Sequence, residues 1–344
     1  MVMQVETTTM NRTLLLVLLV AALGAGAFFI FRMNNDGPST SLVGADREFA
    51  VPREQVYKIF LADRNGNKTT LMRADGRWVY NDQYTVRPDA INNLLSAIEQ
   101  IRMKFKPTAA AVPYMVQSLA TDGIKVEIYD KNGVLIKAYY VGGATNDERG
   151  TYVILDGAEQ PYVAELGSWE GNIRFRYNLT GDDWRDRTVF GATVENIAEI
   201  TVEYPKQQDK SFRVNLRAGK EEVTPFYALS PARQAAPTPG KVEAYAAGFE
   251  KILAASFNNE YRDRDSIARQ LPFAIISLTD KAGQTASVKL FPIYPDAVLD
   301  VKTWTTTQPE GVTAYYALTQ DNDFIILQNQ AVGKLLWAYS FFYD

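Results

Sequence analysis

Residues 124–141 read IKVEIYDKNGVLIKAYYV, and residues 274–291 read AIISLTDKAGQTASVKLF. Each stretch has an alternating apolar run, an Asp-Lys-x-Gly turn and a second alternating run, which predicts a β-hairpin. The apolar positions of the second runs align at a constant offset: Ile136, Ala138 and Tyr140 with Ala286, Val288 and Leu290. Since a one-residue slip turns every side chain over, we expect both copies to bury the same face.

The sequence around each hairpin follows one order. Three short strand patterns come first, then a helical stripe, the hairpin, two further strands and a short closing helix. The stripes are Ile91, Leu94, Leu95, Ile98 and Ile101 in the first copy, and Val242, Tyr245, Phe249, Ile252 and Leu253 in the second. Hairpins dominate, so we predict an α+β fold of two tandem duplicated, mainly antiparallel sheet-plus-helix domains. On the faces expected to be exposed, Lys137 and Tyr139 become Ser287 and Lys289.

An uninterrupted apolar run, Leu14–Phe31, precedes these copies. At about 1.5 Å per residue it matches the thickness of a bilayer core and predicts a single transmembrane helix. The alternative is a cleaved signal peptide with an Ala25-Gly26-Ala27 site, which would leave a very apolar new terminus. We expect an uncleaved anchor in the bacterial inner membrane, with the large domain outside the cytoplasm, whether translation starts at Met1 or Met10.

The predicted domains follow from that anchor. They are a cytoplasmic tail (1–13), the transmembrane helix (14–31), a polar linker (32–50), a first repeat domain (51–189) and a second (190–344). The boundary is placed at the end of a segment rich in charged and aromatic residues, 171–190, that connects the copies.

Composition restricts the possible chemistry. The formal net charge of −4, without a basic cluster, argues against a nucleic-acid partner. The chain has no Cys and no His. It therefore lacks thiol chemistry, the commonest metal ligand and the commonest general base at neutral pH. We expect a protein that is not an enzyme and that uses no cofactor or metal.

The most charged segment of the connection is Asp182-Asp183-Trp184-Arg185-Asp186-Arg187. As an active site, it would use its carboxylates as an acid–base pair or metal ligands. If the segment is instead a structural joint, one Asp would cap a helix and ion pairs would connect the two copies. The same side chains could alternatively contact a partner. We favour the joint, because adjacent Asp residues do not by themselves converge on a metal.

Two further segments have alternative interpretations. The aromatic C-terminus around Trp337 is either core packing or an apolar surface for a partner. Asp321-Asn322-Asp323 resembles half of a calcium loop but lacks the Gly and the distal Glu of such loops, so we expect a turn between strands.

Several of these features occur together in one known family. A Gly76-Arg77-Trp78 strand, a helix beginning at Pro88-Asp89, a strand pair around Asp130-Lys131-x-Gly133 and an Arg185-Asp186-Arg187 segment follow the N-terminal apolar run. This pattern resembles a bacterial family of membrane-anchored domains of unknown function encoded beside ABC transporters of the gliding-motility type. The resemblance implies an auxiliary transporter component and defines no catalytic residue.

These observations lead to one expected function and one alternative. We expect a membrane-tethered accessory or scaffold protein outside the cytoplasm, whose partners are an ABC transporter permease or other envelope proteins. The alternative is a module that binds an envelope glycan or other ligand in a groove between the copies, lined by Trp169, Trp184, Trp304 or Trp337. An enzyme would have to use Asp182, Asp183 or Asp186.

Overall fold

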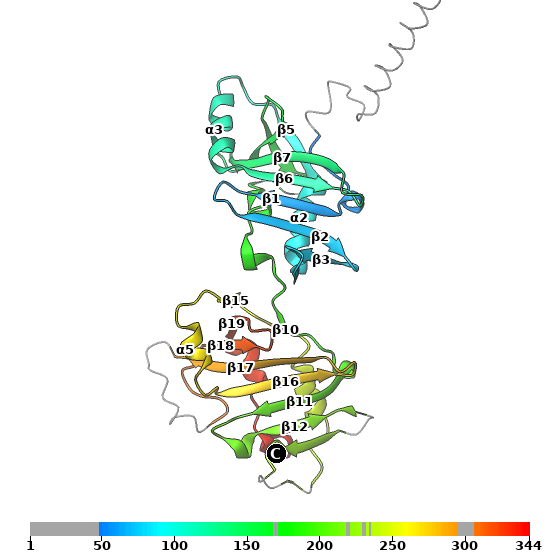
Figure 1. Cartoon of the computed structure of the whole chain (residues 1–344), viewed down its shortest axis with the longest axis vertical. Coiled ribbons are helices and arrows are strands. Elements are labelled where there is room, and N and C mark those ends of the chain that lie inside the picture. Colours follow the sequence, from blue (N-terminus) through cyan, green and yellow to red (C-terminus); the bar gives the residue numbers. More distant parts are fainter. Residues whose placement is uncertain are drawn as a thin grey trace, which may run out of the picture. The chain divides into compact units, whose positions relative to one another are not determined.

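The computed structural model describes residues 48–344 except 168, 170, 218–220, 229–231, 234 and 295–305 (Figure 1). The predicted cytoplasmic tail and transmembrane helix lie outside the described residues. Within the described part, no helix is long and apolar enough to cross a membrane. The chain divides into two compact units, Met1–Asp75 with Asn92–Leu179, and Gly76–Ile91 with Thr180–Asp344. The expected boundary between residues 189 and 190 stays a prediction.

The described residues form a first sheet of nine strands in the order β4-β3-β2-β1-β6-β7-β8-β9-β5. Neighbouring strands run antiparallel, as β1 does with both β2 and β6. The strands are β1 (Lys58–Ala62), β2 (Lys68–Ala74), β3 (Arg77–Tyr80), β4 (Tyr84–Thr85), β5 (Ile101–Phe105), β6 (Ile124–Tyr129), β7 (Leu135–Ala144), β8 (Thr151–Leu155) and β9 (Tyr162–Leu166).

A second large sheet, of eight described strands, has the order β13-β12-β11-β16-β17-β18-β19-β15. Apart from the extra edge strand β4, this is the order of the first sheet, so the repeat in the sequence is a repeat of topology. Its strands are β11 (Ile197–Glu203), β12 (Phe212–Asn215), β13 (Glu222–Pro225), β15 (Ser256–Phe257), β16 (Ala274–Asp280), β17 (Thr285–Ile293), β18 (Ala314–Thr319) and β19 (Phe324–Gln328). A separate pair joins β10 (Thr188–Phe190) to β14 (Ile252–Leu253).

The two long hairpins have equivalent turns. Asp130 Oδ1 accepts the N–H of Asn132 and the N–H of Val134, each at 2.8 Å. In the second hairpin, Asp280 Oδ1 accepts the N–H of Gln284 at the same distance. The glycine of each turn has a positive φ that favours glycine, 78° at Gly133 and 86° at Gly283. The Asp-Lys-x-Gly motif thus forms the same turn in both copies.

The strand that follows the turn, however, is out of register by one residue in the first hairpin. Ile128 pairs with Lys137, whereas Tyr129 pairs with Leu135, so Ile136 is an extra residue in β7. Between β16 and β17 the pairing is continuous from Ala274↔Leu290 to Thr279↔Thr285. An extra residue of this kind is a β-bulge, which moves all later side chains to the opposite face.

The bulge shows that the expected alignment of apolar faces was wrong. The buried side chains of β7 are those of Tyr139 and Val141, whereas Ala138 and Tyr140 are half-buried. Tyr139, which we expected to be exposed, is fully buried, and its hydroxyl lies 3.2 Å from that of Tyr177. Burial beside this second phenol raises the pKa of Tyr139 well above its usual value.

Each sheet has apolar side chains packed on both faces. In the first, Met115 and Leu119 of α3 (Val112–Asp122) pack on Tyr152 and Val163, while the neighbouring Val153 and Tyr162 are buried on the other face. In the second, the main core includes three residues of α4 (Lys241–Ala247): Val242, Tyr245 and Ala246. The other face carries Ile267 of α5 (Arg264–Ala268), packed with Phe291 and Phe324.

The predicted α+β class was wrong, because the described residues form mostly antiparallel sheet with few helices. The longest described helix is α2 (Pro88–Gln100), which begins where the sequence predicted. In the second copy the predicted helical stripe ends early. Helix α4 stops at Ala247, before Gly248, and Ile252–Leu253 form strand β14 instead. Glycine is a weak helix former, and a strand brings Ile252 into the core equally well. A last short helix, α6, spans Asn329–Val332.

The bulge makes a testable prediction about adjacent tyrosines. Tyr139→Lys places an ammonium group at a fully buried position and should cost more than about 4 kcal/mol of unfolding free energy. Tyr140→Lys, at a half-buried position on the opposite face, should cost about 1 kcal/mol. Urea denaturation of the two variants measures the difference. A larger loss from Tyr140→Lys would contradict the register described above.

Candidate functional site

Arg185 is the centre of the charged segment. It follows a short 3-10 turn, Gly181–Trp184, whose last residue is fully buried. The carbonyl of Trp184 accepts the N–H of Arg87 at 2.8 Å, and the N–H of Asp186 donates to the carbonyl of Thr85 at 2.8 Å. These backbone bonds on either side of Arg185 place its side chain beside strand β4.

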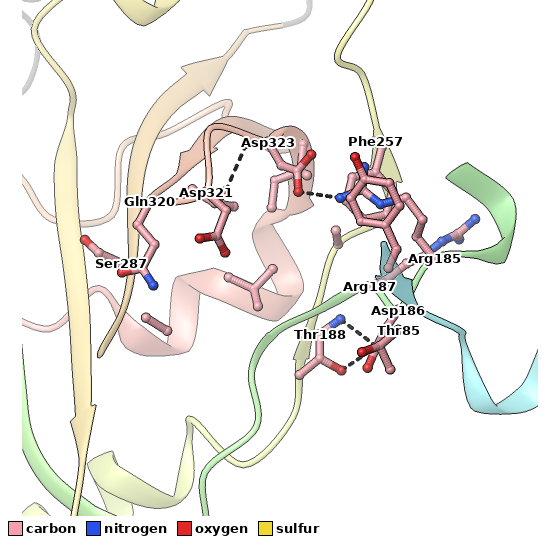
Figure 2. Close-up of a pocket in the computed structure, with 16 residues that line it drawn as sticks. Thr85, Arg185, Asp186, Arg187, Thr188, Phe257, Ser287, Gln320, Asp321 and Asp323 are labelled. Carbon is pink, nitrogen blue, oxygen red and sulfur yellow. Dashed lines mark hydrogen bonds and ion pairs between the residues drawn. The ribbon is translucent and has the colours of Figure 1, made fainter. Parts of the chain in front are cut away.

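The guanidinium of Arg185 is buried by two carboxylates and two aromatic rings. Its Nη2 donates to Asp323 Oδ2 at 2.5 Å (Figure 2). Its Nη1 donates to Asp182 Oδ1 at 3.1 Å. The guanidinium carbon lies 3.8 Å from the ring centroid of Tyr84 and 4.0 Å from that of Phe257. The residue is only 5% exposed. The rings therefore exclude water from the charge, while the carboxylates neutralise it.

Two pKa values reflect this environment. Burial opposes the charged form of Arg185, but hydrogen bonds to Asp323 and Asp182 outweigh it, so the pKa of the guanidinium is raised. Burial, followed by the nearby charge of Asp182, raises the pKa of Tyr80. Arg185 is a permanently charged group. Together with Asp182, Asp323, Tyr84 and Phe257 it forms a structural unit that we call the clamp.

The remaining charges of the segment have partners of their own. Arg187 Nη2 lies 3.0 Å from Asp183 Oδ1, and its Nη1 donates to the carbonyl of Ala255 at 3.0 Å. Asp186 Oδ1 accepts the N–H and the hydroxyl of Thr188, at 3.0 Å and 2.8 Å (Figure 2). The three aspartates of the segment are thus engaged separately, and their contacts do not bring two carboxylates together on one reacting group.

The Asp321-Asn322-Asp323 segment forms the turn between β18 and β19. Asn322 has a positive φ of 65°, and the N–H of Asp323 donates to Thr319 Oγ1 at 3.1 Å. Asp323 Oδ1 accepts a hydrogen bond from Asn259 Nδ2 at 2.9 Å, so one carboxylate contacts both Asn259 and Arg185. In the described part of the chain, no group of three or more His, Cys, Asp or Glu residues could hold a metal ion.

A pocket of about 290 Å³ opens beside the clamp (Figure 2). Its wall combines the aromatic and charged side chains of the clamp with hydroxyl, amide and aliphatic groups. The polar members beyond the clamp are Thr85, Asp186, Arg187, Thr188, Ser287, Thr319, Gln320 and Asp321. This lining could hold a small polar ligand by hydrogen bonds.

Trp337, also singled out from the sequence, contacts a different set of residues. Its ring centroid lies 5.1 Å from that of Tyr245 and 5.2 Å from that of Phe342. The ammonium of Lys241 lies 5.8 Å from the same ring. Half-buried in this cluster, Trp337 packs against the core of the second sheet.

Sequence reasoning found Arg185 but missed most of what surrounds it. Tyr84 and Phe257 each lie in a two-residue strand, and Asp323 is 138 residues further along the chain. Such short strands carry almost no periodic signal. The available hint was Asp321-Asn322-Asp323, an acidic turn at the end of a strand, which we interpreted only as a turn.

A family model described as a domain of unknown function, DUF4340, matches residues 77–266. The chain belongs to the DUF4340 family. The matched range contains Arg185, Tyr84 and Phe257, whereas Asp323 lies beyond it. No curated protein and no solved structure matches the chain. Membership of the DUF4340 family agrees with the expected domain of unknown function and leaves its biochemical role open.

The clamp predicts that Arg185 contributes more to the unfolding free energy than Arg187 does. Arg185→Met leaves Asp323 without its buried cation and should lower the unfolding free energy by about 3 kcal/mol. Arg187→Met removes a more exposed pair and should cost less than about 1 kcal/mol. Chemical denaturation followed by tryptophan fluorescence measures both.

The double variant Arg185→Met with Asp323→Asn separates charge from packing. Because it removes cation and carboxylate together, it should be more stable than Arg185→Met alone. Equal losses for Arg185→Met and Arg187→Met would show that the clamp contributes no more than a surface ion pair.

Proposed function

We propose that this chain is a non-enzymatic, partner-binding component of the bacterial envelope. It would work outside the cytoplasm as an auxiliary subunit of an ABC-type transporter of the gliding-motility kind. The observation that carries the proposal is the internal use of the charged segment. Arg185 is enclosed by Asp182, Asp323 and two rings, and the other charges of the segment are bound to neighbouring groups. Side chains used in this way stabilise a scaffold.

The repeated sheet supports the same proposal. Apart from the edge strand β4, both large sheets have the same strand order, and each packs apolar side chains on both faces. Each sheet offers its own surface to a partner, and the loops of the two sheets differ in sequence. The resemblance noted for Gly76-Arg77-Trp78 and Arg185-Asp186-Arg187 supplies the transporter context. If this proposal holds, the chain acts by binding partners at its surface. Partner specificity then depends on particular surface residues and not on the fold itself.

Affinity capture of the full chain from bacterial membranes in mild detergent tests the proposal. We expect ATPase and permease subunits of an ABC transporter to copurify with the tagged chain and to be absent from an untagged control. The substitution Arg187→Met, which leaves the clamp intact, should not change the capture. Recovery of the chain without transporter subunits under these conditions would refute the transporter role.

The pocket beside Arg185 favours a second candidate, a module that binds an envelope glycan or another small polar ligand. Arg187, Ser287 and Gln320 line it with hydrogen-bonding groups. Of the tryptophans expected to line a groove, Trp184 is fully buried and cannot do so, and Trp304 lies outside the described residues.

A thermal-shift screen of the full chain against envelope sugars tests this second candidate. A ligand at a hundredfold excess over its dissociation constant should stabilise the protein by about 2.7 kcal/mol. Ser287→Leu, which narrows the pocket, should abolish the shift, while Thr279→Leu on the same sheet should leave it unchanged. Unaltered melting with every sugar would rule out glycan binding at this pocket.

A further inference from the structure

Two exposed aromatic side chains meet on the surface of the first unit. Trp169 is 39% exposed and Phe175 49% exposed. Their ring centroids are 5.6 Å apart, with an interplanar angle of 78°. Single exposed apolar side chains are common on any protein, but large rings gathered on one surface are typical of interaction sites.

The tryptophan is supported by the backbone beneath it. Gly171 has a φ of 143°, and a Cβ at this position would lie 2.8 Å from the Trp169 ring. The ring therefore rests on a position where only glycine fits. The N–H of Trp169 also donates to the carbonyl of Leu166 at 3.3 Å. A ring whose positions are restricted by contacts with Gly171 and Phe175 loses less conformational entropy when a partner binds than an unrestricted ring does.

Arg176 adds a positive charge to the two rings. Its guanidinium carbon lies 5.3 Å from the Phe175 centroid and 5.9 Å from the Trp169 centroid. Its Nη1 donates to the carbonyl of Asn93 at 3.4 Å. Among the described residues, no carboxylate forms an ion pair with Arg176. The charge is thus available to an anionic group brought by a partner.

We propose that Trp169, Phe175 and Arg176, the aromatic patch, form the docking surface for a protein partner. That partner presents an apolar side chain flanked by acidic residues. Tryptophan and arginine are the residue types that most often dominate protein–protein binding energy. Because the two rings are in edge-to-face contact, the apolar side chain of the partner would pack on their exposed surface, with its acidic residues beside Arg176. The inference rests on the proposed partner-binding function and assigns it a surface.

The test uses fluorescent peptides and the full chain in mild detergent. The probe is an acidic peptide of Glu and Asp with a central Leu-Phe pair. One matched peptide replaces the acidic residues by Lys, and another replaces Leu-Phe by Ala-Ala. We expect the first to bind, and both matched peptides to bind at least about tenfold more weakly, as measured by fluorescence anisotropy.

Variants of the chain locate the binding. Phe175→Ala and Arg176→Gln should each lower the affinity for the acidic peptide by about tenfold, while Arg176→Lys should retain most of that affinity. Leu271→Ala, at a similarly exposed apolar residue of the second unit, is the control and should change nothing. Unchanged unfolding midpoints would show that the variants remain folded.

Several results would overturn the inference. They are absence of peptide binding, equal binding of the Lys peptide, or no effect of Phe175→Ala and Arg176→Gln. Binding of short-chain phosphatidylglycerol or of an oligogalacturonate to the chain, in the absence of peptide binding, would identify a lipid or a sugar as the ligand instead. If transporter subunits are still captured by a Trp169→Ala, Phe175→Ala variant, only the docking surface is wrong. If the unaltered chain captures none, the proposed function itself fails.

Discussion

The alternation of side chains along a β-strand governs both large sheets, because each sheet packs apolar residues on both of its faces. In such a sheet every strand position must match one of two environments. The single extra residue at Ile136 therefore has a large effect, since it buries Tyr139 fully and turns Tyr140, which stays half-buried, toward the opposite face. The same turn in the second copy leads into an unshifted strand. Two hairpins with closely similar sequence patterns thus bury different positions.

The clamp around Arg185 shows how a fold accommodates a charge that it buries. An arginine loses its hydration when it is only 5% exposed, and hydrogen bonds to Asp182 and Asp323 replace the lost water. Tyr84 and Phe257 cover the remaining surface of the guanidinium. Such a site holds together chain segments that are distant in sequence. The half-buried Arg176 offers a different arrangement, in which two exposed rings lie beside a charge that has no ion-pair partner among the described residues.

Much of the secondary structure could be predicted from local patterns. Strands around Ile59 and Leu71, the helix from Pro88 and both long hairpins have strong periodic signals and well-defined turns. The errors occurred where local patterns compete. The stripe through Ile252 has helical spacing, yet Gly248 ends the helix and the residue joins a strand. The segment 101–122 contains two prolines, a residue type that interrupts helices. Pro113 nevertheless lies in the first turn of α3, where proline is tolerated.

The sequence by itself determined the tandem repeat, the hairpin turns, the buried helix stripe of the first copy from Ile91 to Ile98 and the presence of an unusual charged segment. These features depend on neighbours within a few residues, whose spacing is visible in the chain. Ile101, the last residue of that predicted stripe, begins strand β5 instead. The tertiary structure decided which face of β7 is buried, how Arg185 is neutralised, and which aromatic residues remain exposed. Each of these depends on contacts between distant segments, such as Arg185 with Asp323, or on one bulged residue that leaves no mark on composition or periodicity.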